Sequence, residues 1–304
     1  MYIKQIGSIL LSLLLLTCSK TISPLIQLKN DNKIGSNKRK VLIVGWDGVR
    51  TDALAIADTK NLFFLTKEAT YSWNVDRGPY TVSVPGWSTL LHGVWPNKHG
   101  LTENAFAGNR YADYPDIFSL AKEIQPHLIT ANISNWNQFL DITQQENISI
   151  EVDSDHQLMQ QATLLLNSQT PDISVLHFND PDFNGHETGF SPDNPNYIKA
   201  IQKSDLYLKS LMDIVKYREE NFDEEWMVVV TTDHGGCEGH HEHQDDKKET
   251  RFIWYVIRTP NQQSTDLTLN KTNLVDILPT VFDWLTIPVK KEWGLDGVLL
   301  KRKV

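Results

Sequence analysis

Short runs of continuous apolar residues alternate with amphipathic stretches along most of this 304-residue chain, and that alternation limits its possible folds more than any other feature. Four runs have the length and the β-branched content of buried strands; they span residues 41–46, 127–132, 173–178 and 226–231. Five stretches have the periodicity of helices; they span residues 61–68, 117–124, 157–166, 197–217 and 273–285. Strands that alternate with helices predict an α/β fold, with a mostly parallel central sheet and helices on both of its faces.

The N-terminal residues have a composition unlike the rest of the chain. Lys4 precedes an apolar run over residues 9–16, which is shorter than the about 20 residues that a membrane-spanning helix needs and is typical of a secretory signal. The run ends at Leu15-Leu16-Thr17-Cys18, which resembles a bacterial lipobox, whose cysteine is lipidated and becomes the new N-terminus. A stray thiol in a discarded peptide is the alternative interpretation of Cys18. Residues 19–38 are polar and aperiodic, as in a flexible tether.

These features predict an exported protein of the bacterial cell envelope that is anchored to a membrane by an N-terminal lipid. We expect a lipoprotein-type signal peptide at residues 1–17, a tether at residues 18–38 and a single domain at residues 39–304, which no repeat or linker interrupts. Cys237 is the only cysteine after Cys18, so an intrachain disulfide is not expected in the mature chain. The net charge of −9 argues against binding to duplex nucleic acid. A site for phosphate would therefore need local positive charge, such as bound metal ions.

Carboxylate and imidazole side chains follow three of the predicted strands; they are Asp47, the pair Asp182 and His186, and the pair Asp233 and His234. Because the carboxyl ends of parallel strands share one edge of a sheet, we expect these side chains to meet there. Asp182 and His186 are four residues apart, so a helical turn would place them on one face, where they can chelate one metal ion. Such a mixed ligand set suits zinc, with manganese or iron as alternatives. Turn aspartates, a helix cap and surface histidines are the simpler interpretation of each position alone.

Ser83 stands at a predicted helix start. Pro85 suits the first turn of a helix, and residues 88–91 continue the helical pattern. Ser83 would then lie just before the N-terminus of this helix, where free backbone amides and the helix dipole favour an anion. An ordinary helix cap is the alternative role of this serine.

Four ordered motifs give the chain a specific resemblance; they are Gly45-Trp46-Asp47-Gly48, Ser83-Val84-Pro85 followed by Gly93-Val94-Trp95-Pro96-Asn97-Lys98-His99-Gly100, Asp182-Phe183-Asn184-Gly185-His186, and Asp233-His234-Gly235. Over residues 40–300 the chain resembles the alkaline phosphatase superfamily, most closely its nucleotide pyrophosphatase/phosphodiesterase branch. The resemblance implies an alkaline-phosphatase-like fold and a hydrolase that uses two divalent metal ions, zinc first among them. It further implies cleavage of a phosphodiester or pyrophosphate-type bond of a small-molecule substrate through a covalent phosphoserine intermediate.

The resemblance also implies which residues hold the two metal ions. The first ion would be held by Asp47, Asp233 and His234, and would also bind the nucleophile. The second ion would be held by Asp182, His186 and a third histidine from the loop after Gly236. The spacing of the family pattern favours His241 as this third histidine, and His240 is the close alternative.

The nucleophile implied by the resemblance is Ser83, where this branch more often has threonine. Asn104 falls where the branch places an asparagine that contacts a phosphoryl oxygen. Sulfatases of the same superfamily carry an arginine where this chain has Trp87, and a second aspartate where Gly48 follows Asp47. Both differences count against a sulfatase. The alternatives are a sulfatase, a phosphomonoesterase or a phosphonate hydrolase of this superfamily, or a surface lipoprotein that binds metal without catalysis.

Overall fold

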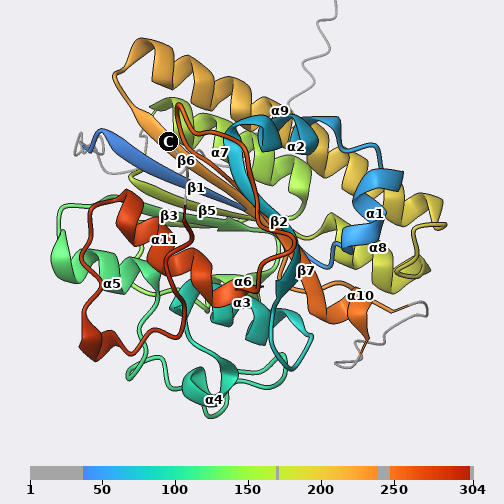
Figure 1. Ribbon diagram of the computed structural model, residues 1–304, viewed down its shortest axis with the longest axis horizontal. Helices are drawn as coiled ribbons and strands as arrows, with labels where there is room; N and C mark the ends of the chain where they lie inside the picture. The colour runs from blue at the N-terminus through green and yellow to red at the C-terminus, as the bar shows by residue number, and fades with distance from the viewer. Residues whose placement is uncertain (1–36, 169–170, 238–246, 302–304) are drawn as a thin grey trace, which may run out of the picture. The chain divides into compact units, whose positions relative to one another are not determined.

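The computed structural model describes residues 37–168, 171–237 and 247–301, which all belong to the second of the two units into which the chain divides, residues 33–304. A nine-stranded sheet lies at the centre of this described part, in the order β4-β3-β5-β1-β6-β7-β2-β8, with β9 paired to β2 (Figure 1). The strands are β1 Arg39–Trp46, β2 Ala69–Asp76, β3 Thr130–Ser134, β4 Ile148–Glu151, β5 Ile173–Phe178, β6 Glu225–Thr231, β7 Phe252–Arg258, β8 Thr265–Asp266 and β9 Thr272–Asn273.

Most strand pairs in the sheet are parallel. The five neighbours β4, β3, β5, β1 and β6 all run in one direction, whereas β7 runs antiparallel to both β6 and β2. The predicted α/β fold with a mostly parallel sheet is therefore confirmed.

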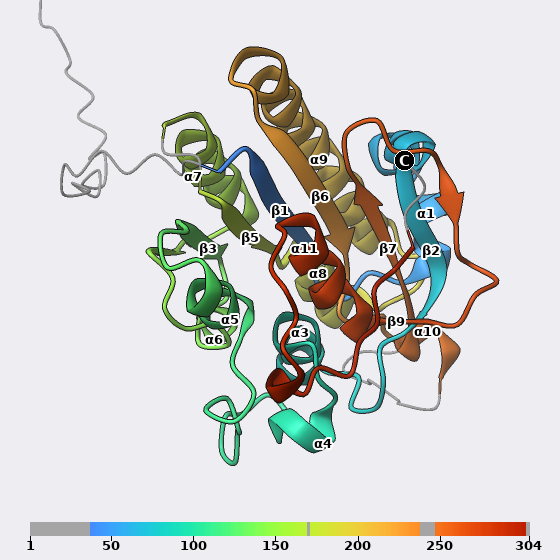
Figure 2. The same cartoon turned by 60° about the vertical axis from the view of Figure 1, so that its left-hand side comes forward.

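Alternate residues of β1 face opposite sides of the sheet and enter two separate cores. Val41 and Ile43 belong to the core that includes residues of α3 Ser83–His92, α5 Ile117–Ile124 and α11 Ile277–Trp284. Leu42 and Val44 belong to the core that includes residues of α1 Thr51–Ile56, α2 Lys60–Leu65, α7 Asp155–Ser168 and α9 Pro195–Asn221. The two groups of helices lie on opposite faces of the sheet (Figures 1 and 2), which buries β1 on both sides.

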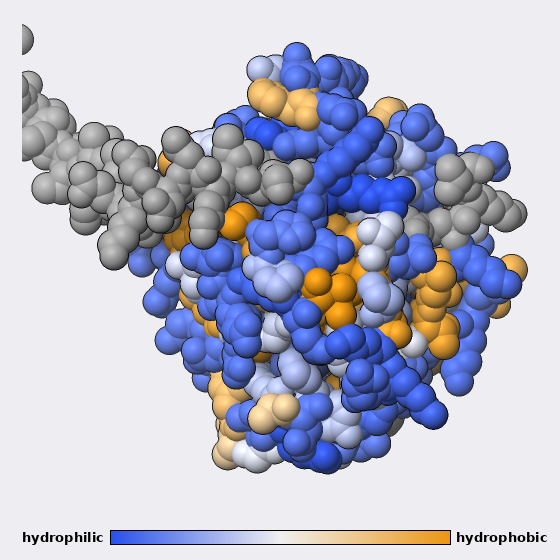
Figure 3. All heavy atoms as spheres, turned by 90° about the vertical axis from the view of Figure 1, so that its left-hand side faces the viewer, coloured by the Kyte–Doolittle hydropathy of each residue, from blue (hydrophilic) through white to orange (hydrophobic). Residues whose placement is uncertain are grey.

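The remaining helices are short; they are η1 Thr66–Glu68, α4 Pro96–His99, α6 Asn137–Leu140, α8 Asp180–Thr188, α10 Lys248–Arg251, η2 Leu274–Asp276 and η3 Lys291–Trp293. The surface near the amino ends of the parallel strands is mostly hydrophilic, with small groups of hydrophobic residues between the polar ones (Figure 3). In the described ranges we find no helix with the length and apolar character needed to cross a membrane.

Some predicted boundaries were wrong. The run at 127–132 forms a strand only from Thr130, because residues 126–127 form a turn in which the Leu128 N–H donates to the Gln125 carbonyl at 3.1 Å. The predicted helix at 61–68 divides into α2 and η1, and the one at 273–285 divides into η2 and α11. Strands β2, β4, β7, β8 and β9 were not predicted.

Helix α3 begins at Ser83 itself, and not after it. Its cap is Val82, whose carbonyl accepts the first helical hydrogen bond, from Gly86. Pro85 is the third helical residue, a position whose missing N–H has no partner within the helix in any case.

The predicted signal peptide, Cys18 and the tether up to residue 36 lie outside the described residues. The lipid anchor and the location in the cell envelope therefore stay predictions, which fatty-acid labelling of Cys18 would test.

Candidate active site

The carboxyl ends of β1 and β6 bring three predicted metal ligands together. The two strands are parallel neighbours in which Gly45 lies opposite Thr231, so the residues that follow them leave the sheet side by side. The ligand atoms of Asp47, Asp233 and His234 lie within 4.8 Å of one another, and all three side chains are fully buried. Two carboxylates and one imidazole at these distances can bind a single cation.

Helix α8 brings the second predicted pair to the same edge. It begins at Asp180, just after β5, which pairs with β1. His186 Nε2 lies 3.4 Å from Asp182 Oδ2, as expected for residues one helical turn apart. Gly48 has a φ of 65°, and a Cβ at this position would lie 2.5 Å from Asp182 Oδ1. Glycine therefore permits both the left-handed turn after Asp47 and the close approach of Asp182.

Ser83 reaches the same cluster from the start of α3. Its Oγ lies 3.0 Å from His234 Nε2 and 3.5 Å from Asp47 Oδ1. Asn104 Oδ1 accepts the backbone N–H of Val84 at 2.9 Å, so this asparagine lies beside the first turn of α3. The structure thus gathers Ser83 and Asn104 with the predicted ligands.

Arg77 fastens the segment before α3 to the end of β6, a role that the sequence did not reveal. Its buried guanidinium donates hydrogen bonds to three backbone carbonyls, those of Asp233 at 2.8 Å, Pro79 at 2.7 Å and Val82 at 3.4 Å. These bonds join the chain before the predicted nucleophile to the backbone of a predicted ligand. They therefore restrain the segment that precedes Ser83 relative to the cluster.

The pKa values of the three buried carboxylates are shifted, two of them upward and one downward. Burial raises the pKa of Asp233 well above the ordinary value, and the charge of Asp47 adds to the rise. It also raises the pKa of Asp182 to about 6, again with a contribution from Asp47. Burial opposes ionisation of Asp47 too, but hydrogen bonding and attraction to His177, together with attraction to His234, outweigh it and hold the pKa of Asp47 below its usual range. A bound cation would reverse both rises, because it favours ionised carboxylates.

The donor set fits divalent metal ions. Asp182 Oδ1 and Asp233 Oδ2 are buried and have no hydrogen-bond partner among the residues that the structure describes. Buried polar atoms nearly always have a partner, so free oxygens of this kind are expected at ligand positions. The Gly235 carbonyl can only accept, and it lies 2.7 Å from His234 Nδ1. A neutral His234 ring therefore carries its proton on Nδ1 and directs the Nε2 lone pair at the cluster.

The motifs around this site correspond to a known family. The model of the type I phosphodiesterase / nucleotide pyrophosphatase family matches residues 41–124 and 111–253, most of the described chain. The chain belongs to this family. The matched ranges include Asp47, Ser83, Asp182, His186 and Asp233.

Two curated relatives of this phosphodiesterase-family chain are similar over part of their length. An uncharacterised pyrophosphatase/phosphodiesterase of Schizosaccharomyces pombe is 22% identical over 273 residues, which cover 82% of this chain and 54% of the relative. A 2,3-bisphosphoglycerate-independent phosphoglycerate mutase of Mycoplasma mobile is 29% identical over 145 residues, 46% of this chain and 25% of the relative. The chain spans about half the length, or less, of these relatives.

Solved structures show the same fold at low sequence identity. Murine ectonucleotide pyrophosphatase/phosphodiesterase 5, an inactive form in complex with AMP, has a TM-score of 0.66 and 14% identity, over 83% of this chain and 96% of that one. A putative sulfatase of Bacteroides thetaiotaomicron has a TM-score of 0.70 and 14% identity, over 87% and 74%. The alkaline-phosphatase-like fold expected from the sequence is therefore confirmed.

The sequence did not reveal the contacts that two residues, His177 and Trp87, make in the site. His177 lies inside the apolar run of β5, where it resembles a core residue, yet its Nε2 lies 2.7 Å from Asp47 Oδ2. Trp87 was considered only as a difference from sulfatases, yet its indole Nε1 donates to the same oxygen at 2.9 Å. A histidine within a continuous apolar strand was the one available signal. His240 and His241 lie outside the described residues, so the third ligand of the second metal stays a prediction.

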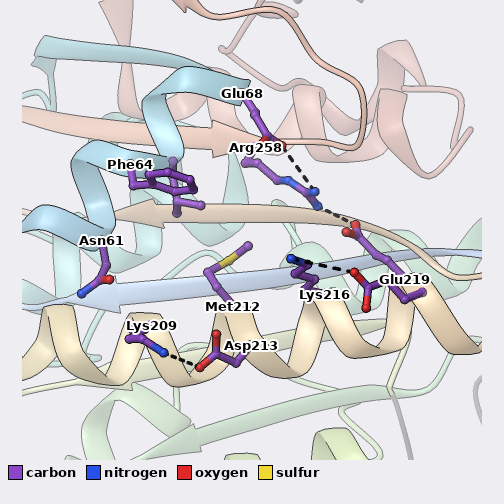
Figure 4. Close-up of a pocket in the computed structure, with 11 residues that line it drawn as sticks. Asn61, Phe64, Glu68, Lys209, Met212, Asp213, Lys216, Glu219 and Arg258 are labelled. Carbon is purple, nitrogen blue, oxygen red and sulfur yellow. Dashed lines mark hydrogen bonds and ion pairs between the residues drawn. The ribbon is translucent and has the colours of Figure 1, made fainter.

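A groove of about 550 Å³ lies elsewhere on this phosphodiesterase-family domain, between α2 and α9 (Figure 4). None of its lining residues belongs to the predicted site. Its charged side chains pair with each other, as in Lys209 with Asp213 and Arg258 with Glu219. Size alone therefore does not mark the functional site of this family member.

Metal binding to the cluster should weaken as the pH falls through 6. Burial raises the pKa of Asp182 to about 6 and that of Asp233 well above its ordinary value, so in acid both carboxyls hold protons that a metal ion must displace. Each such proton costs up to about tenfold in apparent affinity per pH unit below its pKa. Competition with a chelating dye, repeated between about pH 5 and pH 8, measures the effect. An affinity for Zn²⁺ that is constant over this range would contradict the prediction.

Proposed function

We propose that this chain is a hydrolase that cleaves a phosphodiester or pyrophosphate-type bond of a small-molecule substrate, through a covalent phosphoserine at Ser83 and with two zinc ions. The observation that carries the proposal is the position of Ser83 Oγ, 3.0 Å from His234 Nε2 and at the edge of a cluster that fits a metal ion. Membership of the type I phosphodiesterase / nucleotide pyrophosphatase family supports the choice of bond.

The site residues would divide into two ligand sets and a nucleophile. The ligand sets would be Asp47, Asp233 and His234 for one ion, and Asp182, His186 and His241 for the other. When bound, the cations would supply Lewis acidity, which lowers the pKa of a hydroxyl group or of water and neutralises charge on phosphoryl oxygens. Arg77 would keep Ser83 and Asp233 at a constant separation through its bonds to both segments.

Ser83 would perform the first chemical step. The Ser83 hydroxyl would lose its proton to solvent, and its Oγ would form a bond to phosphorus while the bond from phosphorus to the leaving-group oxygen breaks. Water would then attack phosphorus, and the bond to Oγ would break with return of a proton to Ser83. The first residue of a ten-residue helix is suited to this role, because free backbone amides and the helix dipole favour the negative phosphoryl oxygens.

Asn104 would orient the phosphoryl group through its amide nitrogen. Its Oδ1 already accepts the N–H of Val84, and a phosphoryl oxygen can only accept. The Nδ2 hydrogens are therefore the donors that would face the substrate. This orientation is consistent with the role that the family resemblance implies.

A sulfatase is the closest alternative, because solved sulfatases share the fold. The place of the arginine in their nucleophile motif is taken here by Trp87, whose indole N–H donates to Asp47. An indole in that contact carries no charge that would replace the arginine. This contact favours a phosphoester over a sulfate ester as the substrate.

Three model substrates would test the proposal. We expect bis-p-nitrophenyl phosphate to have a kcat/KM at least about tenfold above those of p-nitrophenyl phosphate and p-nitrophenyl sulfate. We also expect a chelator to abolish turnover and Zn²⁺ to restore it. A preference for the monoester or the sulfate would contradict the choice of bond, and activity that survives chelation would contradict the metal requirement. A fully metal-loaded protein that is inert on all three would favour a binding role.

A further inference from the structure

The two oxygens of Asp47 have different surroundings. Oδ2 accepts two hydrogen bonds, from Trp87 Nε1 at 2.9 Å and from His177 Nε2 at 2.7 Å. Oδ1 faces the opposite way, 3.4 Å from His234 Nε2 and 3.5 Å from Ser83 Oγ. Asp47, His177 and Trp87 are at most 1% exposed, so water does not compete for these bonds. One oxygen is occupied by donors behind the site and the other is presented to the cluster.

His177 is itself held on two sides. Its Nδ1 lies 2.9 Å from Ser134 Oγ on the neighbouring strand β3. Its ring stacks on Phe139 with a centroid distance of 4.1 Å and an interplanar angle of 17°, and Trp87 meets its edge at 5.2 Å and 90°. The His177 ring cannot rotate without losing its contacts with Phe139 and Trp87. The donor atom of His177 is therefore fixed relative to Asp47.

The direction of the hydrogen bond follows from the acceptor. An ionised carboxylate only accepts, so the shared proton lies on His177 Nε2. Nδ1 contacts Ser134 Oγ, which also donates to the Trp136 carbonyl at 3.1 Å, so a chain of polar contacts runs from β3 through β5 to the end of β1. Partners of this kind, one step behind a metal ligand, fix its orientation and tune its basicity.

We propose that His177 and Trp87 are positioning residues, which hold Asp47 as a ligand through a single oxygen, Oδ1. The proposal rests on the metal-dependent function proposed above. With both donors in place, Oδ2 cannot bind the cation in addition to Oδ1. Asp47 therefore leaves a coordination position for Ser83 or the substrate. Without them, Asp47 would rotate or bind through both oxygens and fill that position.

A purely structural role is the competing explanation, and it makes different predictions. A buried polar group that loses its partner destabilises the whole fold. A structural contact would therefore lower the melting temperature of the metal-free protein. It would leave the metal dissociation constant of the folded protein and its coordination geometry unchanged.

The test uses the full chain and three variants. His177→Phe keeps the ring stack and removes the donor, Trp87→Phe removes the other donor and keeps an aromatic ring, and His177→Gln keeps a donor at the same reach. The dissociation constant for Zn²⁺, the visible spectrum of Co²⁺ bound in place of zinc, and the melting temperature without metal are measured for each. The Co²⁺ spectrum reports the number of ligands, because its intensity falls as coordination number rises.

We expect His177→Phe and Trp87→Phe each to weaken Zn²⁺ binding by about 10- to 100-fold and to reduce the Co²⁺ absorption, with His177→Gln close to the unchanged protein. If His177→Phe does not fold, Trp87→Phe and His177→Gln still decide the matter. If the unsubstituted protein is active, and the folded variants without the donor keep its Zn²⁺ affinity and its Co²⁺ spectrum, this inference alone is overturned. If the unsubstituted protein binds neither Zn²⁺ nor Co²⁺, the proposed function is overturned as well.

Discussion

Replacing Ser83 by alanine should abolish turnover while the protein keeps its fold and its metal. The only group removed is the hydroxyl whose Oγ lies 3.0 Å from His234 Nε2, so the covalent step has no nucleophile. Loss of a nucleophile in other hydrolases lowers kcat by on the order of 10⁴ or more, and we expect a loss of that order here. Turnover of bis-p-nitrophenyl phosphate and the zinc content of the purified protein are the two measurements.

Two matched variants give the Ser83→Ala result its meaning. Ser83→Thr keeps a hydroxyl, and threonine is the more frequent residue in this branch, so turnover should be retained. Ser88→Ala removes another buried hydroxyl of α3, one that bonds Val84 O at 2.6 Å and lies 2.7 Å from Tyr111 Oη. We expect it to cost about 1 kcal/mol of stability and to retain turnover. Undiminished activity of Ser83→Ala would end the covalent scheme.

Replacing Asp233 by asparagine should stabilise the metal-free protein and remove its stabilisation by metal. Burial, with the nearby charge of Asp47, raises the pKa of Asp233, so ionising this group costs folding free energy. The unfolded carboxyl loses its proton above about pH 4. The cost therefore appears above that pH and grows until the folded pKa is reached. Without metal, we expect the variant to gain about 1–3 kcal/mol in the free energy of unfolding near neutral pH.

Metal should stabilise the protein with Asp233 and have almost no effect on the variant. Zn²⁺ at about 100 times its dissociation constant should stabilise the unchanged protein by about 2.7 kcal/mol. The Asp233→Asn variant should gain almost nothing, because it lacks a carboxylate ligand whose buried Oδ2 has no hydrogen bond within the described residues. Urea unfolding with a chelator and with Zn²⁺ measures both free energies. Equal stabilisation of the two proteins by Zn²⁺ would remove Asp233 from the metal site.

Asp213→Asn is the matched control for charge. Asp213 lies on α9, its side chain is 65% exposed, and it pairs with Lys209 at 2.7 Å. Its removal changes the net charge by the same amount as that of Asp233. An exposed pair contributes little, so we expect changes within about 0.5 kcal/mol with and without Zn²⁺.

Three central strands could be predicted because their pattern is local. The runs at 41–46, 173–178 and 226–231 are continuous and apolar, and they form β1, β5 and β6, which are parallel neighbours buried by helices on both faces. The aspartates after them then lie at one edge by geometry. Strands β2 and β7 were not predicted. β2 is partly exposed and pairs antiparallel with β7 across a bulge, so it lacks the pattern of a parallel βαβ unit. β7 is a buried apolar run like the predicted strands, but no helical stretch was expected between it and β6.

The sequence alone determined which residue types stand at the strand ends. It therefore predicted a mixed carboxylate and imidazole site. Only the tertiary structure decided which oxygen of Asp47 faces the cluster. Its donors Trp87 and His177 are 40 and 130 positions away along the chain and belong to different elements. Sequence periodicity reports which face of an element is buried, because it reflects local geometry. It carries no information on which buried side chains of distant elements meet, because that depends on how the whole core packs.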